Sequence, residues 1–212
     1  MAKRQDPAEK YREMSVYEDQ YLSQGMNLIG GMDEAGRGPL AGPVVAACVI
    51  LDPENPVYGV NDSKKLSPKR RQELKKLIEE KALAVGVGIM DEKIIDEINI
   101  LEATKLAMRQ AVENLGLTPQ ILLIDALTIP SIPIPQQGII KGDALSVSIA
   151  AASIIAKETR DALMLEWDAK YPEYGFASHK GYGTPQHIQA IRTYGPLPIH
   201  RRSFIGHFVG NH

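Results

Sequence analysis

The stretch NLIGGMDEAGRGPLAGPVVAACVIL, residues 27–51, contains two apolar runs separated by a segment dense in glycine and proline. Residues 27–32 and 43–51 favour strands, whereas residues 36–42 hold turn-forming types. This order predicts two sequential antiparallel strands joined by an elaborate turn.

The remainder of the chain alternates helical and strand patterns. Ser67 followed by Pro68 is a typical helix start, because proline is favoured at the first helical position. Residues 121–124 form a short continuous apolar run, typical of a strand buried on both faces. Helices are expected over residues 8–22, 69–81, 91–98, 101–115, 143–170 and 185–194, and further strands over residues 84–89 and 121–124. The expected order has two strands first and then strands that alternate with helices. This order predicts a mixed α/β sheet covered by helices.

Length and composition indicate a folded chain. The 212 residues correspond to about 1.4 domains of ~150 residues, hence one large domain with an appendage. Hydrophobic residues at 44% and charged residues at 24% exclude disordered, collagen-like and coiled-coil classes. Neither G-x-G-x-x-G nor G-x-x-x-x-G-K-[ST] occurs, so the sequence does not support a dinucleotide fold or a P-loop NTPase.

Charge is unevenly distributed along the chain. The 24 Lys and Arg against 26 Asp and Glu leave a net charge of -2. No acidic residue follows Glu173, so the tail after it carries +4 and the preceding residues carry -6. The basic residues of the tail are Lys180, Arg192, Arg201 and Arg202. A basic tail beside an acidic body predicts an anionic partner, and the near-neutral total does not exclude nucleic acid.

Neither export nor membrane insertion is expected. The N-terminus is charged from Lys3 onward, and the longest uncharged apolar run, residues 144–156, is shorter than the roughly 20 residues that span a bilayer. The single cysteine, Cys48, lies in an apolar run, which excludes a disulfide framework and a Cys-based zinc site. A core thiol and a cytoplasmic location are expected.

Carboxylates stand at three places where buried structure begins or stops. Asp33 and Glu34 end one apolar run, Asp125 ends another, and Asp143 opens the long helix expected after it. Ligand sites collect at strand ends and helix N-termini, so these acids can converge. Four close carboxylates repel one another unless cations bind. Two Mg²⁺ would balance their charge, activate water and stabilise the leaving oxygen of a phosphate.

Each carboxylate also has an alternative role. Asp143 could be a helix N-cap, a position at which Asp is favoured. Asp125 could be a simple strand-ending turn residue. Asp33 and Glu34 could be solvated, and both can reach one metal site only if the chain bends, because successive strand side chains point to opposite faces. The combination of acids, rather than any one of them, favours a metal site.

Motifs along most of the chain complete a recognisable pattern. The segment GMDEAGRGPLAGP, residues 31–43, resembles the signature of bacterial ribonuclease HII, the type 2 ribonuclease H. The resemblance covers residues 27–205 in family order, through NDSKKL (61–66), IDA (124–126), KGD (141–143), the stretch 146–157, Arg160-Asp161 and SHKGYGT (178–184). It implies a ribonuclease H-like mixed five-stranded sheet flanked by helices, with a helical C-terminal appendage. The expected parts are an N-terminal peripheral helix (1–26), a catalytic domain (27–170) and a basic substrate-binding segment (171–212).

The resemblance implies a two-metal endonuclease. Such an enzyme hydrolyses the RNA strand of RNA–DNA hybrids and cuts 5′ to single ribonucleotides in duplex DNA, leaving 5′-phosphate and 3′-hydroxyl ends. Ribonucleotide removal in DNA repair and primer removal in replication would be its roles, and a monomer is expected. The family's catalytic ligands for two Mg²⁺ or Mn²⁺ ions fall on Asp33, Glu34, Asp125 and Asp143. Asp161, about five helical turns from Asp143, is expected to be a structural ion-pair partner.

The resemblance also implies contacts with the sugar. In the family, the Gly36-Arg37-Gly38 backbone approaches the 2′-hydroxyl that distinguishes RNA from DNA. A tyrosine matching Tyr182 packs on the adjacent sugar. Without the resemblance, a tight turn and a half-buried loop anchor would be the favoured roles of these residues.

A basic stretch overlaps the end of the NDSKKL motif (61–66) and continues into the helix expected after it. Residues 64–76 carry +6, which usually marks a solvated helix face. Because the loop before the helix belongs to the family pattern, Ser63 and Lys64 are expected to contact phosphate, and the helix is auxiliary.

All five histidines lie in the basic tail. They lack the i, i+4 spacing of a helical zinc pair. His179 is expected to line the substrate loop, and the other four to lie on the surface.

Two other functions compete with a nuclease. A phosphohydrolase acting on a small phosphorylated molecule would need a closed pocket and no long basic surface, so the +4 tail disfavours it. A hybrid-binding module with a decayed site is disfavoured because all four motif carboxylates are present.

Overall fold

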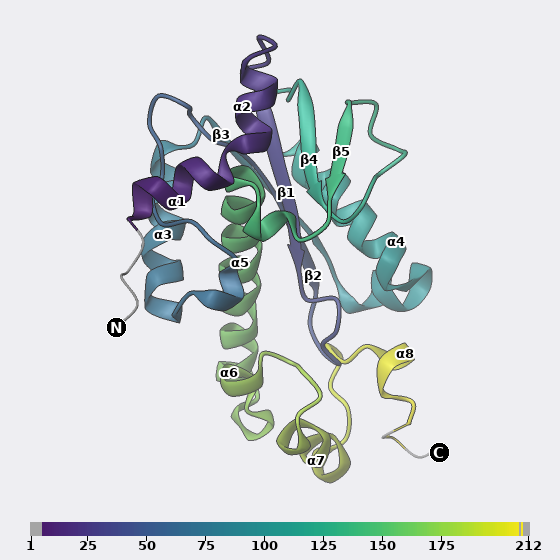
Figure 1. The fold of residues 1–212 in the computed structure, drawn as a ribbon. Helices are drawn as coiled ribbons and strands as arrows, with labels where there is room; N and C mark the ends of the chain where they lie inside the picture. The colour runs from purple at the N-terminus through teal and green to yellow at the C-terminus, as the bar shows by residue number, and fades with distance from the viewer. Residues whose placement is uncertain (1–5, 208, 210–212) are drawn as a thin grey trace.

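A single five-stranded sheet forms the centre of the computed structural model, which describes residues 6–207 and 209. The strands are β1 (Ile29–Ala35), β2 (Val44–Ile50), β3 (Ala84–Met90), β4 (Ile121–Asp125) and β5 (Gln136–Ile139). Their order across the sheet is β3-β2-β1-β4-β5 (Figure 1). β1 pairs antiparallel with β2 and β2 with β3, whereas β4 runs parallel to both β1 and β5. The expected mixed sheet is confirmed.

Helices surround this sheet. They are α1 (Pro7–Met14), α2 (Val16–Leu22), α3 (Pro68–Lys81), α4 (Glu92–Glu113), α5 (Val147–Lys170), α6 (Phe176–His179), α7 (Pro185–Tyr194) and α8 (Arg202–Ile205). The helix expected over residues 8–22 is divided at Ser15, and Asn99, with a φ of 68°, interrupts α4 between the two helices expected there. Within the described ranges, no helix is long and apolar enough to cross a membrane.

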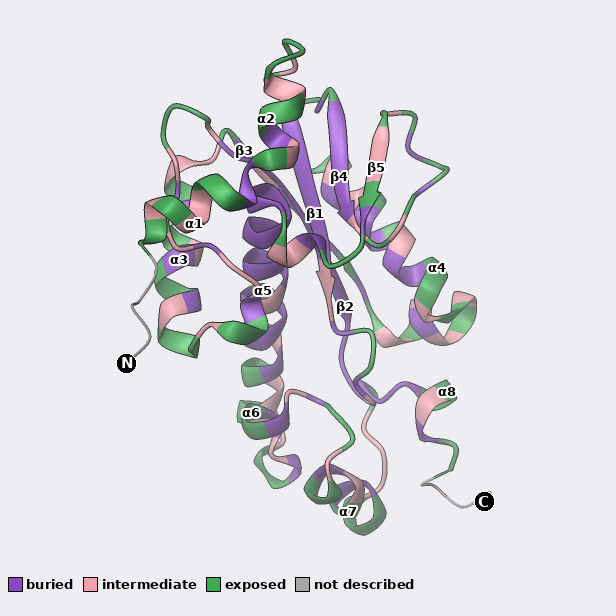
Figure 2. Ribbon diagram, viewed as in Figure 1, coloured by how far each residue is buried: buried purple, intermediate pink, exposed green. Residues whose placement is uncertain are grey.

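The three central strands, β1, β2 and β4, are buried on both faces over most of their length and are drawn mainly in purple in Figure 2. Alternate residues of β2 enter different cores: Ala46 and Cys48 pack with α4, whereas Val45 and Val49 pack with α3 and α5. This period of two is that of a strand covered by helices on each side. Cys48 is the expected core thiol, and burial raises its pKa.

Helix α5 lies almost in backbone contact with β1. A Cβ at Gly31 would lie 2.1 Å from the backbone carbonyl carbon of Ser148, so only glycine fits at this position. The small residues expected to pack tightly at the start of the helix are buried, including Ala150, Ala151 and Ala152. This contact sets the position of the chain segment that precedes α5.

Asp143 does not open the long helix, which corrects the expectation from the sequence. It lies in the 3-10 helix η2 (Gly142–Ala144), and α5 begins only at Val147. The N-cap is Ser146, whose Oγ accepts a hydrogen bond of 3.2 Å from the backbone N–H of Ile149. Because Ser146 caps the helix, the Asp143 carboxylate is not used as a cap.

The chain after α5 forms a separate apolar cluster at the carboxyl end of that helix. Tyr174 and Phe176 pack there with Met164 of α5 and with Ala41 of the turn between β1 and β2. Figure 1 shows α6 and α7 gathered at this end of α5. The division of the chain at residues 26 and 170 stays a prediction.

Candidate functional site

Strand register brings two of the expected acids together. Met32 of β1 pairs with Ile124 of β4 in parallel, so the next residues, Asp33 and Asp125, lie side by side at the end of this pairing. Alternation along each strand gives both side chains the face that α5 covers. The convergence of these two acids therefore follows from strand pairing.

Asp143 completes a cluster of three carboxylates. Oxygen atoms of Asp33, Asp125 and Asp143 all lie within 4.8 Å of one another. The turn that carries Asp143 is attached to the cluster, because the backbone N–H of Gly142 donates a 2.8 Å hydrogen bond to Oδ1 of Asp125. Carboxylate oxygens at this spacing are the ligand type that hard divalent cations prefer.

The electrostatics of the cluster disfavour its ionised form. Burial, with the nearby charges of Glu34 and Asp125, raises the pKa of Asp33 well above its usual range. The pKa of Asp143 is also raised, mainly by burial and then by Asp62 and Asp125, while Lys64 opposes the shift. Like charges in a desolvated site raise one another's pKa, and a bound cation removes that repulsion.

Glu34 stands apart from the other three acids. Alternation along β1 points it to the face opposite Asp33, which is the geometric doubt that the sequence raised. Its Oε1 lies 3.3 Å from the Arg37 guanidinium, and burial raises its pKa. Its Oε2 is buried without a hydrogen-bond partner among the described residues. An unpaired buried carboxylate oxygen fits a ligand that awaits a cation.

A cleft of about 360 Å³ joins three of these acids, Asp33, Glu34 and Asp125, to the expected substrate residues. It is lined by Asp33, Glu34, Asp125, Gly36, Arg37, Gly38, Ser63, Lys64 and Tyr182, together with Ala35, Ser153, Lys157 and Arg160. The tertiary structure thus brings together motifs that lie far apart in the sequence. Ser153, Lys157 and Arg160 were not assigned from the sequence, although their spacing of four and then three residues is that of one helix face.

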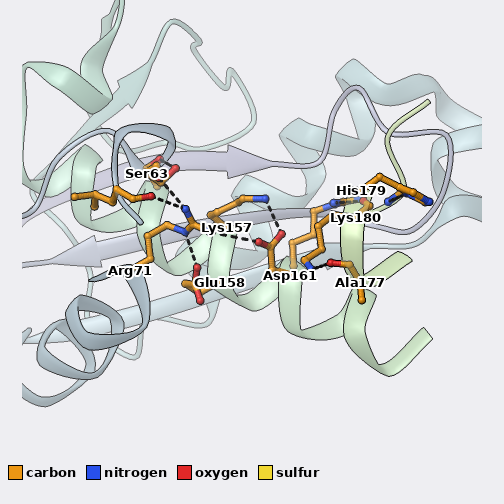
Figure 3. A network of polar contacts seen from close by, with 12 residues as sticks. Ser63, Arg71, Lys157, Glu158, Asp161, Ala177, His179 and Lys180 are labelled. Carbon is orange, nitrogen blue, oxygen red and sulfur yellow. Dashed lines mark hydrogen bonds and ion pairs between the residues drawn. The ribbon is translucent and has the colours of Figure 1, made fainter. Parts of the chain in front are cut away.

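An ion-pair network joins Arg71 of α3 to Glu158 and Asp161 of α5, next to Lys157, which lines the cleft (Figure 3). Lys157 Nζ lies 2.7 Å from Asp161, so Asp161 is the expected structural partner. Arg71 donates to Glu158 at 2.6 Å and to the carbonyl oxygen of Ser63 at 3.3 Å. Arg71 is therefore buried and holds the Ser63 loop, although the sequence suggested a solvated helix face for its stretch.

Arg201 is not a surface residue that grips an anion, which corrects the prediction made for the basic tail. Its side chain is fully buried. The guanidinium donates to the carbonyl oxygens of Gly36 at 2.6 Å, Arg37 at 2.9 Å and Gly42 at 2.8 and 3.0 Å. Burial and the nearby Arg160 lower the pKa of Arg201 to about 9, so the group is still charged at neutral pH.

Arg160 holds the same turn from α5. It donates to the carbonyl oxygens of Ala41 at 3.0 Å, Pro43 at 2.9 Å and Lys180 at 2.9 Å. Two buried guanidinium groups thus fix the turn between β1 and β2, and Arg160 also ties it to the loop that carries Tyr182. Charge-assisted bonds of this kind are stronger than neutral ones.

Three histidines form a buried cluster, which corrects the expectation that His187 and His200 would lie on the surface. His187 and His200 are 0% and 1% exposed, and their Nε2 atoms lie 3.0 Å apart. His187 Nδ1 lies 2.9 Å from the carbonyl oxygen of Tyr182, and His179 Nδ1 accepts from the N–H of Gly181 at 3.2 Å. The cluster therefore holds the Tyr182 loop from inside. His207 is exposed as expected, and His212 lies outside the described residues.

Acid should destabilise the protein through this cluster. Burial lowers the pKa of His187 and of His200 from 6.5 to about 4. Between pH 6.5 and pH 4 these histidines are protonated in the unfolded chain but not in the folded protein. The free energy of unfolding therefore falls as the pH decreases, by on the order of 2 kcal/mol per histidine at pH 5. Urea unfolding at pH 7.5 and pH 5 measures this loss.

The matched comparison is His200→Gln against His207→Ala. The raised pKa values of Asp33 and Glu34 make the folded state more stable as the pH falls, which opposes the effect of the histidines. Both variants keep these two acids, so their contribution cancels in the comparison. His200→Gln should show a smaller loss between the two pH values than His207→Ala. Equal losses in the two variants would contradict the assignment of the acid effect to the cluster.

Comparison of sequences places the chain beside known ribonucleases. The family model described as Ribonuclease HII matches residues 30–207. A ribonuclease HII of Acetivibrio thermocellus is 60% identical over 200 residues, covering 94% of this chain and 78% of the relative. A ribonuclease HII of Clostridioides difficile is 54% identical over 197 residues, covering 93% of this chain and 77% of the relative.

Solved structures share the fold. The chain is similar to the ribonuclease H2 of Pyrococcus horikoshii OT3, with a TM-score of 0.68 and 32% identity over 82% of this chain and 92% of that one. It is also similar to a structure of the PCNA:RNase HII complex of Archaeoglobus fulgidus, with a TM-score of 0.70 and 26% identity over 87% of this chain and 98% of that one. The expected ribonuclease H-like sheet with flanking helices is confirmed.

Proposed function

The chain belongs to the ribonuclease HII family, and from this premise we propose that it excises ribonucleotides from DNA by two-metal catalysis. Membership makes it a hydrolase, an endonuclease of the ribonuclease H type that acts on RNA–DNA hybrids with divalent metal ions. The finer proposal is that it cuts both long hybrids and duplex DNA containing one ribonucleotide. The cut would be 5′ to the ribonucleotide, leaving 5′-phosphate and 3′-hydroxyl ends, and the enzyme would act as a monomer.

The carboxylate cluster carries this proposal. Asp33, Asp125 and Asp143 would hold two Mg²⁺ or Mn²⁺ ions, with Glu34 contributing the buried oxygen that lacks a partner. Bound ions of this kind activate water and stabilise the leaving oxygen in phosphodiester hydrolysis. The protein's part is to hold Asp33, Asp125 and Asp143 within 4.8 Å of one another at neighbouring strands of a rigid sheet, with Glu34 lining the same cleft, which orients the ligands before substrate arrives.

Neighbouring groups would bind the nucleic acid. We assign Lys64, which is exposed and lines the cleft, to phosphate contact, whereas Ser63 is buried and its Oγ accepts a 2.9 Å hydrogen bond from Ser153 Oγ. We assign the Gly38 backbone to the 2′-hydroxyl and Tyr182, which is 45% exposed, to the adjacent sugar. A small-molecule phosphohydrolase would not need these groups along an open cleft.

One cleavage assay tests the proposal. A labelled duplex with one embedded ribonucleotide and its all-DNA twin are incubated with the protein, with and without Mg²⁺ or Mn²⁺. We expect metal-dependent cutting only of the duplex that contains the ribonucleotide, at the phosphodiester bond on the 5′ side of that ribonucleotide. Efficient cutting of the all-DNA duplex, or cutting in excess EDTA, would refute the proposed selectivity or the proposed metal site.

Gly38→Ala should reduce cleavage of RNA-containing substrates without harming the fold. A Cβ at Gly38 would meet nothing closer than Tyr182 Cε1 at 3.7 Å, an ordinary contact. It would occupy space where the backbone must approach the hydroxyl, so kcat/KM should fall roughly tenfold, about 1.4 kcal/mol of transition-state stabilisation. Single-turnover kinetics and thermal unfolding measure the two effects separately.

Gly36→Ala is the contrasting variant. Gly36 has a φ of +99°, and a Cβ there would lie 2.1 Å from Arg160 Nε, so this change should lower the melting temperature as well as the activity. If Gly38→Ala cleaved the ribonucleotide duplex as fast as the unaltered protein, the backbone reading of the 2′-hydroxyl would be wrong.

A further inference from the structure

The N-terminal helices contact the segments that present the metal-cluster acids. The family match begins at residue 30, so α1 and α2 lie outside it. Glu18 of α2 is only 6% exposed, and its Oε1 accepts from Ser146 Oγ at 2.5 Å and from the Ser148 backbone N–H at 3.0 Å. A buried carboxylate thus binds the first turn of α5.

Hydrogen bonds continue from Glu18 to the cluster. The backbone N–H of Ser146 donates to the carbonyl oxygen of Gly142 at 2.8 Å. The N–H of Gly142 in turn donates to Oδ1 of Asp125 at 2.8 Å, and Asp143 is the next residue. Three consecutive links therefore join Glu18 to one proposed metal ligand and to the turn that carries another.

A second contact from α2 reaches the other side of the same turn. The Tyr21 hydroxyl donates to Oε1 of Gln137 in β5 at 2.7 Å. Gln137 pairs with Leu123, and two residues later Ile139 pairs with Asp125 itself. Tyr21 also packs on the apolar cluster that includes Ile139. Helix α2 therefore holds both ends of the segment that connects β5 to α5.

The placement of Glu18 is electrostatically specific. Its negative charge lies at the positive N-terminal end of α5, where an anion is favoured. Burial nevertheless raises the pKa of Glu18, against the hydrogen bonds from Ser146 and Ser148. Its Oε2 has no hydrogen-bond partner among the described residues. A hydrophobic residue would dock α2 without this desolvation cost, so docking alone does not account for a carboxylate here.

We propose that Glu18 is a positioning residue for the metal site: through Ser146 it holds the Gly142–Ala144 turn so that Asp143 faces Asp125 before the ions bind. This inference rests on the proposed metal function of the acids. Partners that orient metal ligands typically change metal affinity by about 10- to 100-fold when they are removed. Loss of Glu18 should therefore weaken metal binding in the absence of any substrate.

The test is Mn²⁺ titration of the full chain by isothermal calorimetry, well below the melting temperature. Glu18→Ala should weaken Mn²⁺ binding by about tenfold or more. Glu18→Gln, which keeps one oxygen to accept from Ser146 and Ser148, should restore most of the affinity. Asp19→Ala removes an exposed charge from the same helix and should change nothing.

Met14→Ala controls for loosened docking, because Met14 is 1% exposed and packs in the core that includes α5. It should lower the melting temperature with little change in Mn²⁺ affinity. Equal affinity losses in Met14→Ala and Glu18→Ala, or an unchanged affinity in folded Glu18→Ala, would overturn the positioning role. If Glu18→Ala does not fold, Glu18→Asp decides, because the shorter side chain keeps the charge but cannot reach Ser146 in the same way: weaker Mn²⁺ binding supports the role and unchanged binding overturns it.

Asp125→Asn distinguishes failure of the proposed metal site from failure of the proposed role of Glu18. If Asp125→Asn loses Mn²⁺ binding while Glu18→Ala keeps it, the metal site stands and the role of Glu18 is wrong. If Asp125→Asn binds Mn²⁺ like the unaltered protein, the metal site itself is wrong, and the inference built on it fails as well.

Discussion

Replacing Asp125 by Asn is expected to reduce cleavage by roughly a thousandfold or more while the protein stays folded, because it removes charge and a proposed ligand from the ions that activate water. The amide keeps an oxygen that can accept the 2.8 Å hydrogen bond from Gly142. Single-turnover cleavage of a ribonucleotide-containing duplex in saturating Mg²⁺ or Mn²⁺ measures the loss.

Asp33→Asn should be equally inactive and more stable than the unaltered chain in EDTA. The pKa of Asp33 is raised in the folded state, so ionising it costs stability once the pH exceeds the usual pKa of aspartate. Asparagine removes that cost at neutral pH, and urea unfolding at pH 7.5 should show it. Near-normal turnover of Asp125→Asn or Asp33→Asn under saturating metal would refute the assignment of these acids.

Arg201→Ala is expected to cause a large loss of both stability and activity. The change deletes four hydrogen bonds from a buried guanidinium and leaves the carbonyl oxygens of Gly36, Arg37 and Gly42 without this donor. Hydrogen bonds to charged groups contribute about 1.5–3 kcal/mol each and are not additive, so a loss on the order of 3–5 kcal/mol is expected. Urea unfolding gives the free energy, and cleavage should fall because this turn lines the cleft.

Arg202→Ala is the matched control for that result. It removes the same charge from the adjacent position, but Arg202 is exposed, so the free energy of unfolding should change by less than about 0.5 kcal/mol. Arg201→Lys should not rescue Arg201→Ala, since an ammonium cannot reproduce the planar fork of donors. Equal stability of the two alanine variants would contradict the structural role of Arg201.

Local patterns were enough to predict much of the architecture. The apolar runs around the turn at residues 36–42 predicted β1 and β2, because neighbouring antiparallel strands need only local pairing. The Ser67-Pro68 start predicted α3, whose N-cap is Ser67. β5, in contrast, follows a proline-rich segment without a strong strand pattern. Its pairing with β4 makes it a strand, which no local signal indicated.

The sequence by itself determined which acids could form a site, since Asp33, Glu34, Asp125 and Asp143 stood where apolar runs began or ended. Whether they meet depends on a register between strands about ninety residues apart and on the turn before α5. The register brings Asp33 and Asp125 together, the turn adds Asp143, and alternation along β1 points Glu34 to the other face. Contacts between residues so far apart in the sequence depend on how the whole sheet packs, and a short window of sequence does not contain that information.

The sequence did not predict which charged side chains are buried and which are exposed. Counting charges in the tail placed Arg201 beside Arg202 as equivalent surface cations, yet one is fully buried and the other exposed. Burial of Arg201 depends on a set of backbone carbonyl oxygens from the turn at residues 36–42, which become available only once β1, β2 and α5 have assembled. A cation enters the interior only where such acceptors compensate its lost hydration, and only the tertiary structure can supply them.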